Sequence, residues 1–383
     1  MKLLVVKLAD LGDVLTVTPA LRALRQGLPT AHITAMVTPK THPVVEGSPL
    51  VDQVLTFDKF IYDVPIQSLR RMALRTGWHL LEQLRREGYQ ALALMHHLTT
   101  CWGTVKYALL TCATKARIRA GLDNGHGWFL TQRVADKGFG GQHEVAYWLE
   151  VAKLLGGRID DPLMTIPLSP GDETAAERCL SGIARRPLVA LHPGSGGYSR
   201  ARRWPLSGFQ VVANALSADY KAQVVLVGGP EEQELAQQIV AGLREPPVNL
   251  VGQTTLRQLG AILQRCDLFV GNDNGLMHLA AAVGTPVVAI FGPSNADAWG
   301  PWYGCWRPKP LEGTKDIRLV PDLTGSIKGA VVQHPLPCSP CLYTGRRLGN
   351  RFGCQELTCL QSLSPHSVLL AARTLLEFHH GAR

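Results

Sequence analysis

Short apolar runs suited to buried strands alternate along the chain with segments whose apolar residues recur at helical spacing. Residues 3–7 predict a first strand, and residues 14–24 predict a helix. A second strand is predicted over residues 32–37, and Gly12 supplies the turn between the first strand and the helix. This order is typical of an α/β unit whose parallel strands are joined by helices.

The same order returns in the second half of the chain. Residues 188–192 predict a strand, residues 193–195 a turn, residues 209–216 a helix, and residues 224–227 another strand. Between the halves, residues 159–186 are rich in Pro and Asp, which is linker composition, and end in a predicted helix. The repeated order predicts two doubly wound α/β domains.

Residues 267–295 form one complete βαβ pattern. A short apolar run at 268–271 leads into the polar turn at 272–275, and a helix of small residues at 276–283 is followed by a strand at 286–291. Such a turn lies at the carboxyl end of the first strand, where helix-start N–H groups point outward, so we expect a phosphate ligand there. An ordinary crossover with a capped helix would show the same pattern.

Composition limits the possibilities. The chain has 383 residues, 46% of them apolar, which is enough for two medium-sized cores. No run of about 18 uncharged apolar residues occurs, so no membrane span is expected. Lys7, Asp10 and Asp13 interrupt the first apolar stretch early, so we interpret it as a strand rather than a signal peptide and expect a cytoplasmic protein.

The net charge of +9 suits a polyanionic partner such as a phosphorylated lipid or a nucleotide, although a solvated basic face would look the same. The chain carries no nucleic-acid-binding module. It also lacks GxGxxG and GxxxxGK[ST], which disfavours dinucleotide-binding enzymes and P-loop NTPases. The basic residues occur mostly in scattered pairs: Arg70-Arg71, Arg85-Arg86, Arg185-Arg186, Arg202-Arg203 and Arg346-Arg347.

Several motifs together resemble glycosyltransferase family 9, the heptosyltransferases. They are VVKLADLGDVLTVTPAL, LHPGSGGYSRARRWP, LVGGPEEQELA, LVGQTTLRQLGAIL and GNDNGLMHLAAAVGTPVVAIFGPSN, and they occur in order from the N-terminus onward. The resemblance implies an α/β GT-B fold, in which two facing Rossmann-like doubly wound domains enclose a cleft. It also implies inverting, metal-independent transfer of heptose from ADP-heptose to the inner core of lipopolysaccharide, or to a related phosphorylated glycolipid, at the inner leaflet of the membrane. The enzyme would be cytoplasmic and peripheral to the inner membrane.

The resemblance also implies which substrate each domain binds. Residues 1–183 would bind the acceptor and residues 184–364 the nucleotide sugar, with the cysteine-rich segment 338–359 in the second domain. The terminal amphipathic helix at 365–379 would pack back onto the first domain.

Inverting transfer needs a base for the acceptor hydroxyl. Asp13 matches the family's proposed catalytic base, and Lys7 would pair with it and hold it ionised. A helix N-cap is the alternative role for Asp13, and a strand end from which the side chain reaches solvent is the alternative for Lys7. We expect acceptor contacts from Gly12, Arg117 and Arg119, within a first domain that is rich in basic residues.

The departing diphosphate needs a positive, N–H-rich site. Gly194 and Ser195 end a strand with free N–H groups, and Arg202 stands where the family carries a phosphate-binding lysine. Arg203 is the alternative if the loop shifts by one residue. Glu231 matches the acidic residue that the family places on the nucleotide ribose, although a first-turn helix glutamate would serve the helix dipole equally well.

The remaining donor residues are expected in the turn after residue 271: Asp273, Asn274, Gly275 and His278. The family usually shows D-[ST]-G-x-x-H here. Asn274 departs from that pattern by removing a hydroxyl, which leaves the donor sugar open. His278 either faces the phosphates or is a satisfied core histidine, and the resemblance favours the phosphates.

Four of the nine cysteines form a cluster, Cys338-x2-Cys341 and Cys354-x4-Cys359, in a Pro/Gly/Arg-rich segment. Four thiols at such spacing could hold a structural zinc ion or an iron–sulfur cluster, while free or disulfide-paired thiols are the alternative. No cofactor is required for the reaction that the resemblance implies.

Two other functions remain open at this stage. A nucleotide-sugar epimerase also has two Rossmann-like domains, and it would form product without an acceptor. A non-catalytic nucleotide-sugar-binding relative is the second, favoured only by Arg202 and Asn274.

Overall fold

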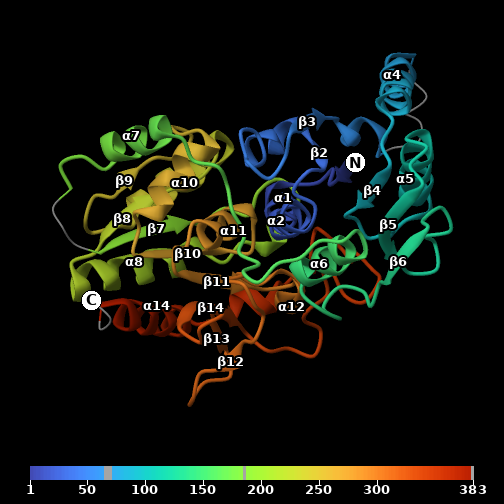
Figure 1. Ribbon diagram of the computed structural model, residues 1–383. Coiled ribbons are helices and arrows are strands. Elements are labelled where there is room, and N and C mark those ends of the chain that lie inside the picture. Colours follow the sequence, from blue (N-terminus) through green and yellow to red (C-terminus); the bar gives the residue numbers. More distant parts are fainter. Residues whose placement is uncertain (64–70, 184–186, 381–383) are drawn as a thin grey trace. The chain divides into compact units, whose positions relative to one another are not determined.

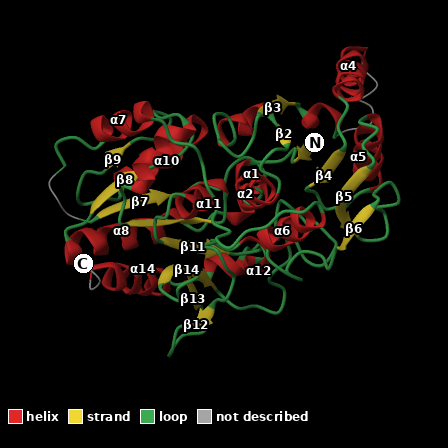
Figure 2. Ribbon diagram, in the orientation of Figure 1, coloured by secondary structure: helices red, strands yellow, loops and turns green. Residues whose placement is uncertain are grey.

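The computed structural model describes residues 1–63, 71–183 and 187–380, so Arg70, Arg185 and Arg186 of the basic pairs lie outside the described residues. The chain divides into two compact units, residues 1–162 and 163–383. Each unit is built on one β-sheet with helices packed on it, and the sheet is parallel in unit 1 and mostly parallel in unit 2 (Figure 2). Among the described helices, none is long and apolar enough to cross a membrane.

Unit 1 contains a six-stranded sheet in the order β3-β2-β1-β4-β5-β6, and every neighbouring pair is parallel. Strand order reverses between β1 and β4, and the crevice at the carboxyl ends of such a pair is the usual ligand site of an open α/β sheet. The strands are β1 (Lys2–Val6), β2 (His32–Val37), β3 (Gln53–Thr56), β4 (Ala91–Leu94), β5 (Ile118–Asp123) and β6 (Gln132–Ala135).

The helices of unit 1 cover both faces of this sheet. Helix α2 packs against α6, and α4 packs against α5. The helical segments are α1 (Leu11–Leu15), α2 (Thr18–Gly27), η1 (Pro39–Val44), η2 (Lys59–Tyr62), α4 (Arg71–Glu87), α5 (Cys101–Ala113) and α6 (Glu144–Leu154). The single helix expected over residues 14–24 is therefore two helices.

The alternation of side chains along β1 separates two environments. Leu4, Val6 and Leu8 belong to the core cluster that includes residues of α4 and α5. Lys7 is directed to the opposite face, where it meets Trp148 of α6. The end of β1 therefore serves a charged site on one face and an apolar environment on the other.

Unit 2 repeats the strand order of unit 1. Its eight-stranded sheet runs β12-β13-β14-β11-β10-β7-β8-β9, and the six strands from β14 to β9 are parallel. Strand order reverses between β7 and β10, and β12 and β13 add an antiparallel edge. The strands are β7 (Leu188–His192), β8 (Gln223–Leu226), β9 (Val248–Asn249), β10 (Leu268–Asn272), β11 (Val287–Phe291), β12 (Lys309–Pro310), β13 (Ile317–Pro321) and β14 (Ile327–Gln333).

Helices α8 and α14 lie on one face of this sheet and α7 and α10 on the other (Figure 1). The helical segments are α7 (Pro170–Cys179), η3 (Arg200–Arg202), α8 (Leu206–Tyr220), η4 (Pro230–Glu232), α9 (Gln233–Ala241), α10 (Leu256–Gln264), α11 (Gly275–Ala282), α12 (Ala296–Trp299), α13 (Thr358–Gln361) and α14 (Pro365–His380). The expected α/β class with two Rossmann-like parallel sheets is confirmed.

Two expectations about the domains differ from the structure. Residues 163–183 group with unit 2 because α7 packs against α10, so the division falls at residue 162 rather than 183. The terminal helix α14 was expected on the first domain. Its buried side chains lie instead in the core of unit 2, together with those of α8 and β14, because its apolar face is matched by the apolar residues of those elements.

Candidate functional site

The crevice of unit 1 brings Lys7 and Asp13 together. Lys7 Nζ lies 3.2 Å from Asp13 Oδ1 and 4.2 Å from the centroid of the Trp148 ring. The lysine side chain is only 4% exposed, whereas that of Asp13 is 31% exposed. The buried ammonium therefore orients a carboxylate that solvent and ligands can still reach. The expected pairing of the two residues is present.

Asp13 does not cap a helix. Asp10 occupies the N-cap position of α1, and Asp13 is the third residue of that helix, after the buried Gly12. The Asp13 carboxylate is thus directed to Lys7, while its backbone carbonyl accepts a hydrogen bond from Thr16 Oγ1. Gly12 lies in the same turn, as expected.

A buried charged network of His97, Asp136 and Glu144 lies next to Trp148, the residue that Lys7 contacts. This network was not predicted from the sequence. His97 Nδ1 is 2.9 Å from Asp136 Oδ2, and His97 Nε2 is 3.0 Å from Glu144 Oε1. Burial alone would lower the pKa of His97, but the two carboxylates outweigh it and raise the pKa to about 9. The His97 ring also lies 5.6 Å from that of Trp148, edge-on. The network supports the aromatic ring against which Lys7 rests.

His96, the preceding residue, has the opposite character. Its Nε2 accepts a hydrogen bond of 2.8 Å from the backbone N–H of Leu8, which links the end of β1 to the end of β4. Burial, together with the positive charges of Lys7 and Lys59, holds the pKa of His96 well below its usual value. His96 is therefore a structural acceptor across the crevice.

Arg117 and Arg119 lie away from this crevice. Arg119 is the second residue of β5 and pairs with Leu92 near the amino end of β4, and Arg117 precedes β5. Lys7 and Asp13 follow the carboxyl end of β1, and all strands of the sheet run parallel. The two arginines therefore lie at the amino ends of the strands, away from Lys7 and Asp13. The structure does not bring them together with Asp13.

The crevice of unit 2 is built from the turns after β7 and β10. Asn272 Nδ2, at the end of β10, donates to the carbonyl oxygens of Pro193 and Gly194 at 2.8 and 3.0 Å. Ser195 is buried, and its hydroxyl donates to the backbone carbonyl of Ser199. The two turns are thereby fixed to one another.

Both candidate arginines converge on Ser195. Arg202 Nη2 donates to the Ser195 carbonyl at 3.3 Å and its Nη1 lies 3.2 Å from Asp273 Oδ2, while Arg203 Nε donates to the Ser195 hydroxyl. Arg202 Nε is buried and has no hydrogen-bond partner among the described residues. Burial would lower the pKa of Arg202, but Asp273 raises it, so the guanidinium stays charged. One buried cation thus retains an unused donor.

Asn274 has a structural role that the sequence did not reveal. Its Oδ1 caps α11 by accepting from the N–H groups of Leu276 and Met277. Its amide nitrogen therefore faces His192 Nδ1, at 2.9 Å. His192 must then carry its hydrogen on Nε2, which it donates to Glu232 Oε2 at 2.8 Å. The polar atoms of Asn274 are occupied within the protein.

Glu232, rather than its neighbour, is the buried acid of the GGPEE motif. Burial would raise the pKa of Glu232, but His192 and the backbone N–H groups of Gly229 and Gly196 lower it to about 2. Glu231 is exposed at the carboxyl end of β8 and remains accessible to a ligand. Glu231 was the acid predicted from this motif, and the buried pair of Glu232 and His192 was not predicted.

His278 is buried in α11, immediately past the first turn that begins at Gly275. Its ring lies 6.3 Å from the Trp299 ring, edge-on. Trp299 in turn lies 5.6 Å from Tyr343, and Tyr343 lies 6.1 Å from Tyr198. Arg202 lies 5.8 Å from the Tyr198 ring. A row of aromatic rings, also missed from sequence, thus borders the arginine.

The cysteine-rich segment closes over this region. The N–H groups of Cys341 and Leu342 donate to the carbonyl of Pro293, and the Ser199 hydroxyl donates to that of Arg351. All nine cysteines are free thiols. The segment therefore contributes Tyr343 to the crevice and covers the loops after β7 and β11.

The metal site that the spacing of Cys338, Cys341, Cys354 and Cys359 allowed is not found among the described residues. Over residues 1–63, 71–183 and 187–380, no group of three or more His, Cys, Asp or Glu side chains is arranged to hold a metal ion. Cys338, Cys341 and Cys354 are exposed, whereas Cys359 is packed in the apolar core of unit 2. Burial and the neighbouring cysteines raise the pKa of the Cys359 thiol to about 11. Its thiol thus serves packing.

Comparison with known proteins identifies the family. The family model "Glycosyltransferase family 9 (heptosyltransferase)" matches residues 78–304. The chain belongs to glycosyltransferase family 9. As a member of this family it is a glycosyltransferase, and the resemblance read from the sequence motifs is confirmed.

Among its relatives is lipopolysaccharide heptosyltransferase 3 of Escherichia coli, which is 27% identical over 325 residues, or 80% of this chain and 90% of that protein. Two solved structures resemble the fold. A family 9 glycosyltransferase from Veillonella parvula has a TM-score of 0.73 and 23% identity, covering 98% of this chain and 97% of that one. The E. coli ADP-heptose lps heptosyltransferase II has a TM-score of 0.70 and 22% identity, covering 99% and 100%.

Proposed function

We propose that this glycosyltransferase moves heptose from ADP-heptose to the inner core of lipopolysaccharide, or to a related phosphorylated glycolipid, with inversion. The observation that carries the proposal is the Lys7–Asp13 pair, a partly accessible carboxylate fixed at the crevice of an α/β sheet. The names of the relatives, which include ADP-heptose and lipopolysaccharide, support these substrates.

In the proposed reaction Asp13 takes the proton of the acceptor hydroxyl as its oxygen attacks the anomeric carbon of the heptose. The new C–O bond forms on the face opposite ADP, the bond to ADP breaks, and ADP leaves with the bonding electron pair. Lys7 acts through Asp13 by orienting its carboxylate. Gly12 lets the backbone of the same turn approach the acceptor.

The donor would bind in the crevice of unit 2. Gly194, Ser195 and Gly275, the first residue of α11, would offer backbone N–H groups to the diphosphate. Arg202 would add its unused Nε donor, and Arg203, half-exposed beside Ser195, a second positive charge. In this proposal, groups of the protein itself bind the diphosphate and accept the proton, so the reaction requires no cofactor.

Three further donor contacts are part of the proposal. Glu231 would accept hydrogen bonds from the ribose hydroxyls, since its carboxylate is exposed at the carboxyl end of β8. His278 would approach the diphosphate from α11. Asp273 and Asn274 would act indirectly, because Asp273 holds Arg202 and Asn274 holds the turn.

The acceptor class determines where the protein works. A lipid-linked acceptor at the inner leaflet would place it at the cytoplasmic face of the inner membrane, and the net charge of +9 favours such an anionic surface. Arg117 and Arg119 would contribute to this attraction only through long-range charge, because they lie near the amino ends of the strands and not beside Asp13.

Replacing Asp13 tests the function directly. Asp13→Ala should lower turnover about a hundredfold or more, as expected for loss of a general base, and leave ADP-heptose affinity unchanged by calorimetry. Asp10→Ala removes an exposed carboxylate from the same turn and is the matched control. Turnover by Asp13→Ala close to that of the unmodified protein would refute the assigned base.

The same assay separates the other functions. ADP release that depends on the core-lipid acceptor supports transfer. Product formed from the nucleotide sugar alone would instead indicate an epimerase, and binding without any product would indicate a non-catalytic relative.

A further inference from the structure

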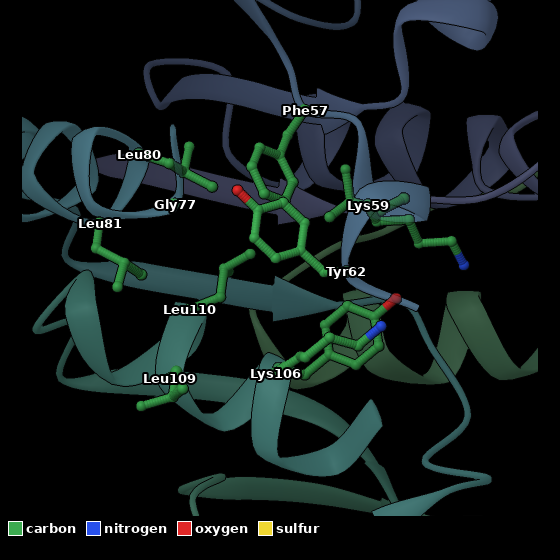
Figure 3. A pocket seen from close by; sticks show the side chains of 11 residues that line it. Phe57, Lys59, Tyr62, Gly77, Leu80, Leu81, Lys106, Leu109 and Leu110 are labelled. Atoms are coloured by element: carbon green, nitrogen blue, oxygen red, sulfur yellow. The ribbon is translucent and has the colours of Figure 1, made fainter. Parts of the chain in front are cut away.

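A cavity in unit 1 is not used by the proposed reaction. It has a volume of about 140 Å³ and lies between η2, α4 and α5, next to the end of β1. Figure 3 shows its leucines on one side and the ammonium groups of Lys59 and Lys106 on the other. The lining residues are Leu8, Phe57, Lys59, Tyr62, Gly77, Leu80, Leu81, Lys106, Tyr107, Leu109 and Leu110.

The two lysines give this apolar cavity one charged end. Lys106 Nζ is 2.6 Å from Asp63 Oδ1, so its charge is paired. Lys59 forms no ion pair within the described part of the chain, and its ammonium lies 5.4 Å from the centroid of the Phe60 ring. One positive charge at the mouth is therefore available to an anionic group.

The surface around the cavity is also unusually apolar for a face exposed to water. Trp78 is 70% exposed, and exposed apolar side chains come from each of the three segments that border the cavity. The last turn of helix α4, which ends at Glu87, carries Arg85 and Arg86, and Arg86 is paired with Glu82. Apolar side chains interspersed with basic ones are typical of a surface that meets an anionic membrane. The exposed apolar residues are Phe60, Ile61, Leu74, Trp78, Trp102, Val105 and Leu109.

The cavity adjoins the catalytic side of the same sheet. Leu8, which lines it, directly follows Lys7, and the side chains of the two residues project to opposite faces of β1. Burial lowers the pKa of Lys59, and the nearby carboxylates of Asp63 and Asp13 offset this only in part. A lipid held in the cavity would thus lie beside the crevice that contains Asp13.

We propose that this cavity takes an acyl chain of an anionic membrane lipid, whose head group lies on Lys59 and Lys106. The inference rests on the proposed function only in assuming that the enzyme works at a membrane. Gly77 offers a way to close the cavity. The three atoms nearest to a Cβ there all belong to Tyr62, the hydroxyl oxygen at 3.3 Å being the first, and leucine suits a helix better than glycine.

The test is a fluorescence titration of the full-length protein with monomeric dihexanoyl phosphatidylglycerol, using tryptophan emission. Trp102 is a natural reporter because its Nε1–H donates to the carbonyl of Tyr62, a lining residue. Gly77→Leu should weaken binding about tenfold or more. Lys59→Gln should weaken it about fivefold, the effect of one positive charge near an anionic lipid.

Two matched controls accompany these variants. Gly171→Leu makes the same change in α7, where a Cβ meets only Ser169 Oγ at 3.6 Å. Lys153→Gln removes one exposed charge from α6. Both should bind the lipid like the unmodified protein, and dihexanoyl phosphatidylcholine should bind more weakly than phosphatidylglycerol.

Unchanged lipid binding by Gly77→Leu would overturn the proposal, and so would equal affinity for the two lipids. Turnover with ADP-heptose and a deacylated, water-soluble acceptor should stay normal in Gly77→Leu. Loss of the acyl-chain site is thereby distinguishable from failure of the proposed function, which Asp13→Ala tests separately.

Discussion

At the scale of single residues, Gly194 shows how closely the donor crevice is packed. A Cβ at this position would lie 1.7 Å from Glu232 Oε1. Gly194→Ala must therefore displace the buried Glu232 and disturb its hydrogen bond to His192. We expect a loss of about 1–3 kcal/mol in the free energy of unfolding, together with weaker ADP binding. Denaturant titration and calorimetry measure both effects.

Gly197 provides the control for this substitution. It lies in the same loop, and a Cβ there meets no atom within 4 Å. Gly197→Ala should leave stability and ADP binding unchanged. If Gly194→Ala behaved the same way, the Glu232–His192 pair would not be held as rigidly as the contacts indicate.

His97 makes the stability of unit 1 depend on pH. Its pKa of about 9 in the folded protein exceeds the ordinary value of 6.5. The contribution of its charged form is therefore complete below about pH 6.5 and is lost as the pH rises through about 9. We expect the free energy of unfolding to fall by about 3 kcal/mol over this range, measured by urea denaturation.

Glu144→Gln removes the carboxylate that raises this pKa most strongly. The variant should show a much flatter dependence of stability on pH, and an NMR titration should give a lower pKa for the His97 ring. A stability curve for the unmodified protein that is flat between pH 6.5 and 9 would show that His97 is not charged in the folded state.

The residues predicted for the site follow strand ends, whereas their buried partners were not predicted. Lys7, Asp13, Ser195 and Arg202 were predicted because they lie within short motifs. The buried pair His192–Glu232 joins residues 40 positions apart, and His97 meets Glu144 across 47 positions. Such pairings depend on how the helices pack on the sheet, and no local pattern encodes them.

At the scale of elements, the parallel strands were the most predictable features. Residues 32–37 and 188–192 match β2 and β7 residue for residue, because strands covered on both faces are continuous apolar runs. The helix predicted over 14–24 failed for a local reason. Pro19 has no N–H to donate within a helix, so α2 begins at Thr18 with the proline in its first turn. Strands of two residues, such as β12, leave no periodicity to detect.

Helix α14 is the element whose position was predicted wrongly, and mutation can test its packing. Leu375 is fully buried among residues of unit 2. Leu375→Ala should lower the stability of unit 2 by about 2–5 kcal/mol. Hydrogen exchange measured on α8 and β14 should accelerate accordingly, because both contact α14.

The matched control lies on the same helix. Phe378 is 52% exposed, so Phe378→Ala should change stability by less than about 0.5 kcal/mol. Faster exchange confined to unit 1 in Leu375→Ala would contradict the packing described here and would favour the position first expected for this helix.

At the scale of the whole molecule, both units have the same strand order. The functional groups at the point where the strand order reverses differ between the two units. The crevice between β1 and β4 holds an accessible carboxylate beside a buried lysine. The crevice between β7 and β10 holds a buried arginine and the start of a helix. The repeated order of predicted strands and helices indicated two α/β units, but the identical strand order was visible only in the structure, since β3 and β9 carry weak patterns.

Because each unit has a core cluster of its own, a ligand that binds one crevice should stabilise that unit by itself. ADP at a hundred times its dissociation constant should add about 2.7 kcal/mol to the stability of unit 2. Hydrogen exchange should then slow at the amides of β7, β10 and residues 193–199, and stay unchanged at residues 7–13. Arg202→Ala should abolish the protection, since it removes the buried cation of the crevice. Protection of residues 7–13 by ADP alone would instead assign the nucleotide to unit 1 and reverse the proposed roles of the two units.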